Sequence, residues 1–152
     1  MLDSPLLTDL GVVALAGLIC GVLDITCTLT LSKLNGIAPM RLLQAVASGL
    51  LGPKSFTGGA NTAALGLGFH FLIAFTAAGA YFAASRKLSV FNEHALLCGL
   101  LYGIAVHLFM SFVVLPLSAL KRPFSIKAFA TQLVVHMFFV GLPISLVVRH
   151  FA

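Results

Sequence analysis

Charged residues are scarce in this chain. Only 9% of its 152 residues are Asp, Glu, Lys or Arg, whereas 60% are hydrophobic, and the mean hydropathy is +1.10. A soluble domain carries about 25% charged residues, so the composition excludes an ordinary soluble fold. The same balance is typical of a membrane protein, in which basic residues are concentrated in the loops.

Acidic residues are the scarcest charged type. Asp and Glu total 4, against 9 Lys and Arg, and tryptophan is absent. We find no pair of acids for hydrolysis, no nucleophile–base arrangement and no phosphate-binding glycine loop, so the sequence does not favour an enzyme. The basic residues stand singly or in pairs between apolar runs, without a basic face or a stacking platform. We therefore expect a lipid bilayer, and no nucleic acid, as the partner of this chain.

Cysteine is also rare, and its spacing excludes two common roles. Cys20 and Cys27 are seven residues apart, roughly 10 Å along one helix, which is too far for a disulfide. With Cys98 they form no CxxC or zinc-ribbon pattern. We interpret all three as small apolar fillers of helices.

Four long apolar runs dominate the sequence. They lie near 9–31, 61–83, 94–116 and 126–148, and each is long enough to cross a bilayer, which takes about 20 residues. The first run is too long for the core of a signal peptide and lacks a clear cleavage site, so we interpret it as a retained helix. The prediction is an all-α, polytopic membrane protein with one domain, residues 1–152, folded as a four-transmembrane-helix bundle.

A short amphipathic helix is predicted near 39–51, within the long loop 1–2. Pro39 favours a helix start and Gly52 a helix end. Gln44 and Ser48 fall on other faces than the apolar positions, so we expect a helix lying in the membrane interface or tucked against the bundle. The apolar positions, spaced i, i+3, i+4 and i+7, are Leu43, Val46, Ala47 and Leu50.

The distribution of basic residues predicts an orientation. Loops 1–2 and 3–4 carry six of them and the opposite side carries three. Because basic loops stay in the cytoplasm, we expect loops 1–2 and 3–4 inside and both termini outside. The six are Lys33, Arg41, Lys54, Lys121, Arg122 and Lys127, and the three are Arg86, Lys87 and Arg149.

Each predicted span contains one ionisable residue: Asp24, His70, His107 and His136. At 1.5 Å per residue, Asp24 lies roughly 6 Å from the middle of its helix and the histidines within about 3 Å, on the loop 1–2 side or near the midplane. Titratable groups at this depth are costly unless they face the interior and find partners. We therefore predict that the four converge in one polar layer.

Several chemistries fit such a layer. All four residues together are a plausible shell for a divalent metal ion such as Zn²⁺, Fe²⁺ or Mn²⁺. Two of the histidines His70, His107 and His136 could instead ligate a haem b for electron transfer. A carboxylate and histidines at similar depth could also bind and transfer protons. The structural alternative is that these residues only hydrogen-bond one another and fix the bundle register.

A non-catalytic role is the remaining alternative. The chain could be a structural or accessory subunit of a larger membrane complex, or form a homo-oligomer. Pairs of small residues four apart let helices approach closely in lipid, either between chains or within one bundle. These pairs are Gly17/Gly21, Ala74/Ala78 and Gly99/Gly103.

Two prolines bear on helix geometry. Pro143 leaves the carbonyl of Phe139 without its helical partner, which predicts a kink one turn from His136. Pro116 stands where the third span is expected to end.

Four segments carry a family resemblance: "MRLLQAVASGLLG", "HFLIAF", "LYGIAVHLFMSFVVLPLSA" and "GLPISLVVRH". Together they resemble a family of small bacterial integral membrane proteins of unassigned function, over most of the chain from Gly21 onward. The resemblance implies a bacterial inner-membrane protein with four helices. It implies no activity, ligand or catalytic residue.

Overall fold

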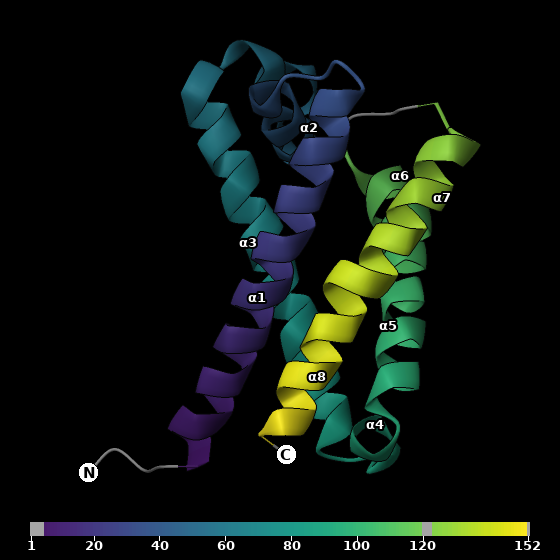
Figure 1. The fold of residues 1–152 in the computed structure, drawn as a ribbon. Helices are drawn as coiled ribbons and strands as arrows, with labels where there is room; N and C mark the ends of the chain where they lie inside the picture. The colour runs from purple at the N-terminus through teal and green to yellow at the C-terminus, as the bar shows by residue number, and fades with distance from the viewer. Residues whose placement is uncertain (1–4, 120–122, 152) are drawn as a thin grey trace.

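The computed structural model describes residues 5–119 and 123–151, and within these ranges it is helical, without strands (Figure 1). The first span is α1 (Pro5–Leu34) and the second is α3 (Gly59–Ser85). The third joins α5 (Ala95–Phe109), a π-helical segment η2 (Met110–Val114) and α6 (Leu115–Leu117). The fourth joins α7 (Ile126–Val135), a π-helical segment η3 (His136–Gly141) and α8 (Leu142–His150). The connections contain α2 (Pro39–Leu51), the 3-10 helix η1 (Gly52–Thr57) and α4 (Val90–Glu93).

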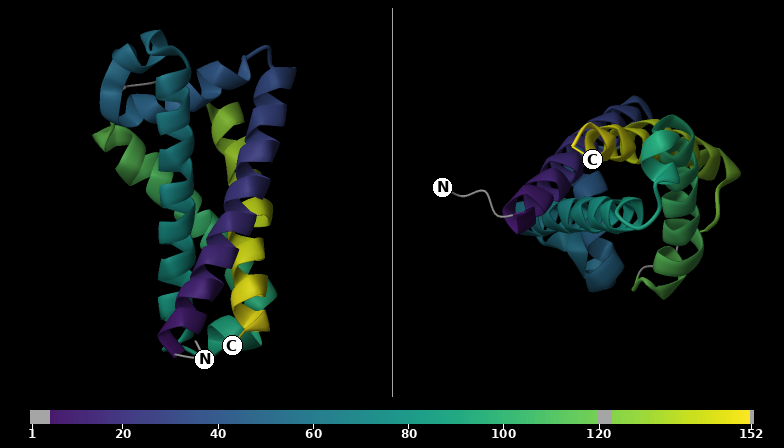
Figure 2. Two further views of the ribbon diagram at one scale, coloured as in Figure 1. Left: turned by 90° about the vertical axis from the view of Figure 1, so that its left-hand side faces the viewer. Right: turned by 90° about the horizontal axis from the view of Figure 1, so that it is seen from below.

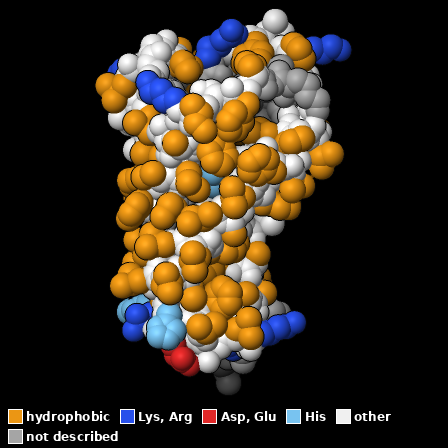
Figure 3. All heavy atoms as spheres, turned by 90° about the vertical axis from the view of Figure 1, so that its right-hand side faces the viewer, with side chains coloured by type: hydrophobic (Ala, Val, Ile, Leu, Met, Phe, Trp, Pro, Cys, Tyr) orange, Lys and Arg blue, Asp and Glu red, His pale blue; other side chains and the backbone are white. Residues whose placement is uncertain are grey.

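Four of these helical stretches are long and apolar enough to cross a membrane. Figure 3 shows apolar side chains over the middle of one face, with Lys and Arg gathered at its two ends. The prediction of four membrane-spanning helices is therefore confirmed by length and composition, with boundaries a few residues wider than expected. The stretches are Thr8–Leu34, Gly59–Ser85, Ala95–Leu117 and Ile126–His150.

Small residues bring the spans together inside the molecule. On α1, a Cβ at Gly21 would lie 2.7 Å from Cε1 of Phe71 on α3. On α5, a Cβ at Gly103 would lie 2.6 Å from the Cα of Met137 in the fourth span. Glycine therefore allows each pair of helices to pack closely. The small-residue pairs found in the sequence serve internal packing, and the accessory-subunit role stays a prediction.

The apolar core fills the end of the bundle away from α2. Tyr81 is completely buried there, and its hydroxyl donates to the carbonyl of Phe91, 3.1 Å away. Tyr102 on α5 donates to the carbonyl of Ala77 on α3 at 2.7 Å. Both hydroxyls are thus satisfied by backbone acceptors. The core consists of Val12, Ala16, Cys20, Ala74, Ala78, Tyr81, Val140, Ile144 and Val148.

Helix α2 has the predicted bounds, and its buried side only partly matches the expected apolar face. Ala47 is completely buried as expected, but Gln44 and Ser48 are buried beside it and Leu50 is 68% exposed. The Gln44 side chain finds a partner at the start of α3, where Nε2 donates to the carbonyl of Gly59 at 3.1 Å. Figure 2 shows α2 running across the end of the bundle. The placement of α2 in a membrane interface stays a prediction. Two of the basic residues that predict the orientation, Lys121 and Arg122, lie outside the described residues.

The two π-helical segments each end just before a proline. The N–H of Leu115 donates to the carbonyl of Met110, and the N–H of Leu142 donates to the carbonyl of Met137, each five residues back. Proline at the next position has no N–H to continue the ordinary helical pattern. The irregularity predicted around Pro143 thus takes the form of a π segment, which begins at His136. Such segments occur frequently at functional sites.

Candidate functional site

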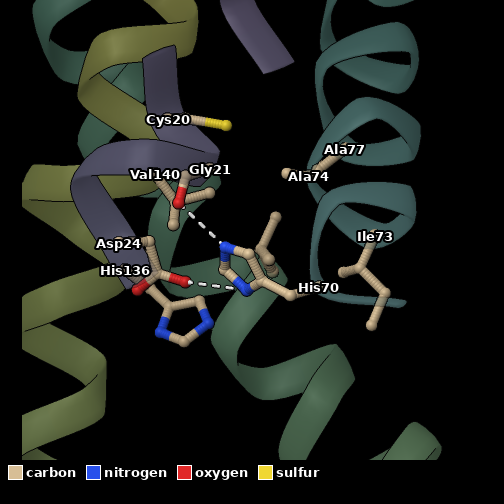
Figure 4. A pocket seen from close by; sticks show the side chains of 10 residues that line it. Cys20, Gly21, Asp24, His70, Ile73, Ala74, Ala77, His136 and Val140 are labelled. Carbon is tan, nitrogen blue, oxygen red and sulfur yellow. Dashed lines mark hydrogen bonds and ion pairs between the residues drawn. The ribbon is translucent and has the colours of Figure 1, made fainter. Parts of the chain in front are cut away.

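Asp24 and His70 form an ion pair between α1 and α3. The carboxylate Oδ2 lies 3.8 Å from Nδ1 of His70, and the side chains are 14% and 13% exposed, respectively. The other ring nitrogen, Nε2, lies 2.8 Å from the carbonyl oxygen of Gly21 (Figure 4). Thr28, one turn after Asp24, donates its hydroxyl to Oδ1 at 3.4 Å. The pair is therefore held from both sides by groups of α1.

The carbonyl of Gly21 determines which nitrogen of His70 carries a proton. A carbonyl oxygen only accepts, so Nε2 must be the donor. In the neutral ring the unprotonated nitrogen, Nδ1, then faces the carboxylate of Asp24. Two lone pairs facing each other at 3.8 Å repel, and one proton on either atom removes the repulsion. Nδ1 of His70 and Oδ2 of Asp24 are therefore two acceptors that face each other across 3.8 Å.

His107 and His136 form a second pair. Their ring centroids are 5.1 Å apart, and Nδ1 of His136 lies 2.7 Å from the carbonyl of Gln132. By the same argument Nδ1 of His136 is the donor, which leaves its Nε2 as an acceptor when the ring is neutral. His107 is only 4% exposed and lies against the ring of Phe129, with centroids 4.6 Å apart. Within the described part of the chain, no group forms a hydrogen bond with its Nε2.

The two pairs meet at a small cavity of about 30 Å³. Asp24, His70 and His136 all line it. His107 does not line the cavity, but its ring lies against that of His136. Figure 4 shows His70 directed toward Asp24 and Gly21, and the ring of His136 near the same space. A cavity of this size has room for a water molecule, because one probe sphere occupies roughly 10–15 Å³, and the three ionisable side chains in its otherwise mostly apolar lining supply the polar partners that a water needs. The structure thus brings all four ionisable residues of the spans into one region.

The metal site and the haem site considered from the sequence stay predictions. Across residues 5–119 and 123–151, no three His, Cys, Asp or Glu side chains are grouped to hold a metal ion. Carbonyl oxygens hold Nε2 of His70 and Nδ1 of His136, which leaves the other nitrogen of each ring available. The cavity of about 30 Å³ is far smaller than the roughly 300–1,000 Å³ of sites for larger organic ligands.

Three features of the site are not evident from the sequence. The contact of His136 with Gln132, four residues earlier, uses the backbone carbonyl of Gln132 and not its side chain. Thr28 was missed, although its position four residues after Asp24 places it on the same face. The sequence also does not indicate that Val106 and Val140 line the cavity, because apolar residues are common in every span.

Comparison with protein-family models, with curated proteins and with solved structures finds no match to this chain. The resemblance to small bacterial membrane proteins therefore stays a prediction, and the function rests on the geometry of the site.

Proposed function

We propose that this multi-pass membrane protein binds a proton on the Asp24–His70 pair and exchanges it with His136 across the cavity. The observation that carries the proposal is the approach of Oδ2 of Asp24 to Nδ1 of His70, 3.8 Å, while Nε2 is held by the carbonyl of Gly21. An isolated carboxylate within a membrane costs several kcal/mol. A shared proton offsets that cost by making the pair either two neutral groups or two opposite charges.

Exchange with His136 needs only one bridging molecule. A water in the cavity can donate to Nε2 of His136 and accept from the Asp24–His70 pair, because all three side chains line the same space. When the proton moves, the pair loses one positive charge and the imidazole of His136 gains one. His107, stacked on His136, is the next titratable ring. The polar layer is thus a short relay, with Nδ1 of His136 fixed by Gln132 and Nε2 available.

Nitrogen NMR of ¹⁵N-histidine-labelled protein in lipid nanodiscs tests the proposal. We expect the ring of His70 to hold a proton on Nε2 throughout, and Nδ1 to share a proton with Asp24. Asp24→Asn removes the carboxylate that faces Nδ1, so it should change the ¹⁵N shift of Nδ1. Asp9→Asn, at the far end of the same helix, is the matched control and should leave His70 unchanged. If Asp24→Asn changes nothing, the shared proton is refuted.

We also propose that the protein resides in a bacterial inner membrane with the α2 end in the cytoplasm. The excess of basic residues on loops 1–2 and 3–4 supports this orientation. Labelling of single cysteines in intact and in opened cells tests it, with Asn61→Cys near the α2 end and Glu93→Cys near the other. The orientation is wrong if Asn61→Cys is labelled in intact cells and Glu93→Cys is not.

A further inference from the structure

A second, larger space lies between the end of α1 and the start of α7. Its volume is about 260 Å³, enough for several water molecules, because each needs roughly 10–15 Å³ of such volume. It is at the α2 end of the bundle, because the last turns of α1 and the first turns of α7 line it (Figure 1). We call this space the vestibule. Its polar lining residues are Ser32, Asn35, Ser125, Lys127, Thr131 and Gln132.

Two chains of polar groups connect the vestibule to the proton site. On the fourth span, Gln132 lines the vestibule, and its carbonyl holds Nδ1 of His136 at 2.7 Å. On α1, Ser32 lines the vestibule, Thr28 lies one turn deeper, and Asp24 lies one turn deeper again. Residues four apart share a face of a helix, so these three form one polar stripe. The hydroxyl of Thr28 already donates to Asp24 at 3.4 Å.

The opposite end of the bundle also has polar groups, but they are bound within the packed core. Tyr81 and Ser145 are completely buried, and their hydroxyls, like that of Tyr102, donate to backbone carbonyls. Ile144 and Val148 belong to the same core and are at most 1% exposed. The site therefore borders a packed core on this side, whereas the polar stripe toward α2 leads to the vestibule.

We propose that protons reach the Asp24–His70 pair from the α2 end only, through the vestibule. This inference rests on the proposed proton site and adds the side from which it is loaded. Thr131 and Ser32 stand on the two walls of the route, and neither belongs to the pairs that hold the proton. Filling the vestibule with apolar side chains should therefore slow proton entry without removing the binding site.

Charge displacement on a solid-supported membrane measures this entry. Protein reconstituted with its α2 end facing the solution should give a transient current after a pH jump. The double variant Ser32→Leu/Thr131→Leu should keep the total charge moved but slow the transient by about tenfold, the effect of roughly 1.4 kcal/mol added to the barrier. Thr76→Leu, which changes an exposed threonine of α3 away from the route, is the matched control and should keep the wild-type rate.

A reversible block guards against misfolding of the leucine variant. Thr131→Cys, modified with a bulky thiol reagent and then released with reductant, should lose and regain the fast transient, while wild type treated in the same way stays fast. If the blocked protein keeps the wild-type rate, proton entry through the vestibule is refuted. It is also refuted if protein inserted with the opposite orientation gives a transient current of the same size and rate. Absence of any Asp24-dependent transient in wild type instead overturns the proton site itself, so the two failures are distinguishable.

Discussion

His70 is bound by the backbone of one helix and by the side chain of a residue one turn away. Its Nε2 donates to the carbonyl of Gly21 at 2.8 Å, and its Nδ1 faces Asp24 at 3.8 Å. The close approach of α1 and α3 makes this geometry available, because Gly21 presents no side chain to Phe71. The imidazole is therefore fixed in one orientation, and only one of its nitrogens is free to exchange a proton.

The fixed orientation predicts the tautomer of His70. When the ring is neutral, the proton should reside on Nε2, because the carbonyl of Gly21 can only accept, and Nδ1 should then face Asp24 without a proton of its own. The ¹⁵N shifts of the two ring nitrogens, measured through a pH series, distinguish the tautomers directly. His94→Gln, which alters an exposed histidine, should leave these shifts in place. A neutral ring with its proton on Nδ1 would show that the bond to Gly21 does not form.

Stability measurements separate a relay from a merely structural layer. His107 is buried, and its Nε2 has no hydrogen bond among the described residues, although a backbone hydrogen bond to Phe129 holds the ring. His107→Phe removes one unsatisfied buried atom and one hydrogen bond together, so it should change the stability by no more than about 1 kcal/mol. His70→Phe, which breaks the pair with Asp24, should destabilise by about 3 kcal/mol or more, since it leaves a buried carboxyl group without its partner.

Denaturation in mild detergent measures both variants against wild type. If His107→Phe destabilises as much as His70→Phe, the polar layer serves mainly to hold the bundle together, and a relay through His107 loses its support.

Much of this site could be predicted from periodicity and depth alone. A single ionisable residue in each of four apolar spans has to face the interior, so the convergence of Asp24, His70, His107 and His136 follows from the cost of charge in lipid. Their division into two pairs does not follow. It depends on the backbone carbonyls of Gly21 and Gln132. Every residue has a backbone carbonyl, so no sequence pattern indicates which ones bind the histidines.

Helix irregularity and burial were harder to predict. A π segment adds a residue to a helical turn, so the face presented after His136 differs from that of a regular helix. On α2, the pattern of apolar residues predicted the helix and the burial of Ala47, but not the burial of Gln44 and the exposure of Leu50, because the Gln44 side chain binds a carbonyl of α3. Lipid is as apolar as the protein interior, so an apolar side chain that faces lipid gains little free energy by turning inward.

The two-pair arrangement predicts the result of metal analysis. Protein purified without chelators should contain less than stoichiometric zinc, iron or manganese, because no three His, Cys, Asp or Glu side chains are grouped to hold a metal ion among the described residues. Elemental analysis of wild type and His136→Ala checks this. Stoichiometric metal in wild type that disappears in His136→Ala would replace the proton site with a metal site.

The packing of α5 against the fourth span should be sensitive to a single methyl group. A Cβ at Gly103 would meet the Cα of Met137 at 2.6 Å and also clash with the carbonyl of His136. Backbone atoms cannot move aside, so Gly103→Ala should destabilise by about 1–3 kcal/mol, the usual cost of overpacking. Gly11→Ala is the matched control, because its Cβ would have no neighbour within 4 Å and alanine favours the helix by roughly 0.5–1 kcal/mol.

The same substitution also tests how the site is positioned. Since the added methyl group of Gly103→Ala presses on the residue that begins η3, it should shift the ¹⁵N resonances of His136 and leave those of His70 nearly unchanged, because His70 is held by α1. Equal stability of Gly103→Ala and Gly11→Ala would mean that the close contact between α5 and the fourth span does not form. A loss of stability with an unmoved His136 would mean instead that the bundle absorbs the methyl group elsewhere, and that the position of the imidazole is set by Gln132 alone.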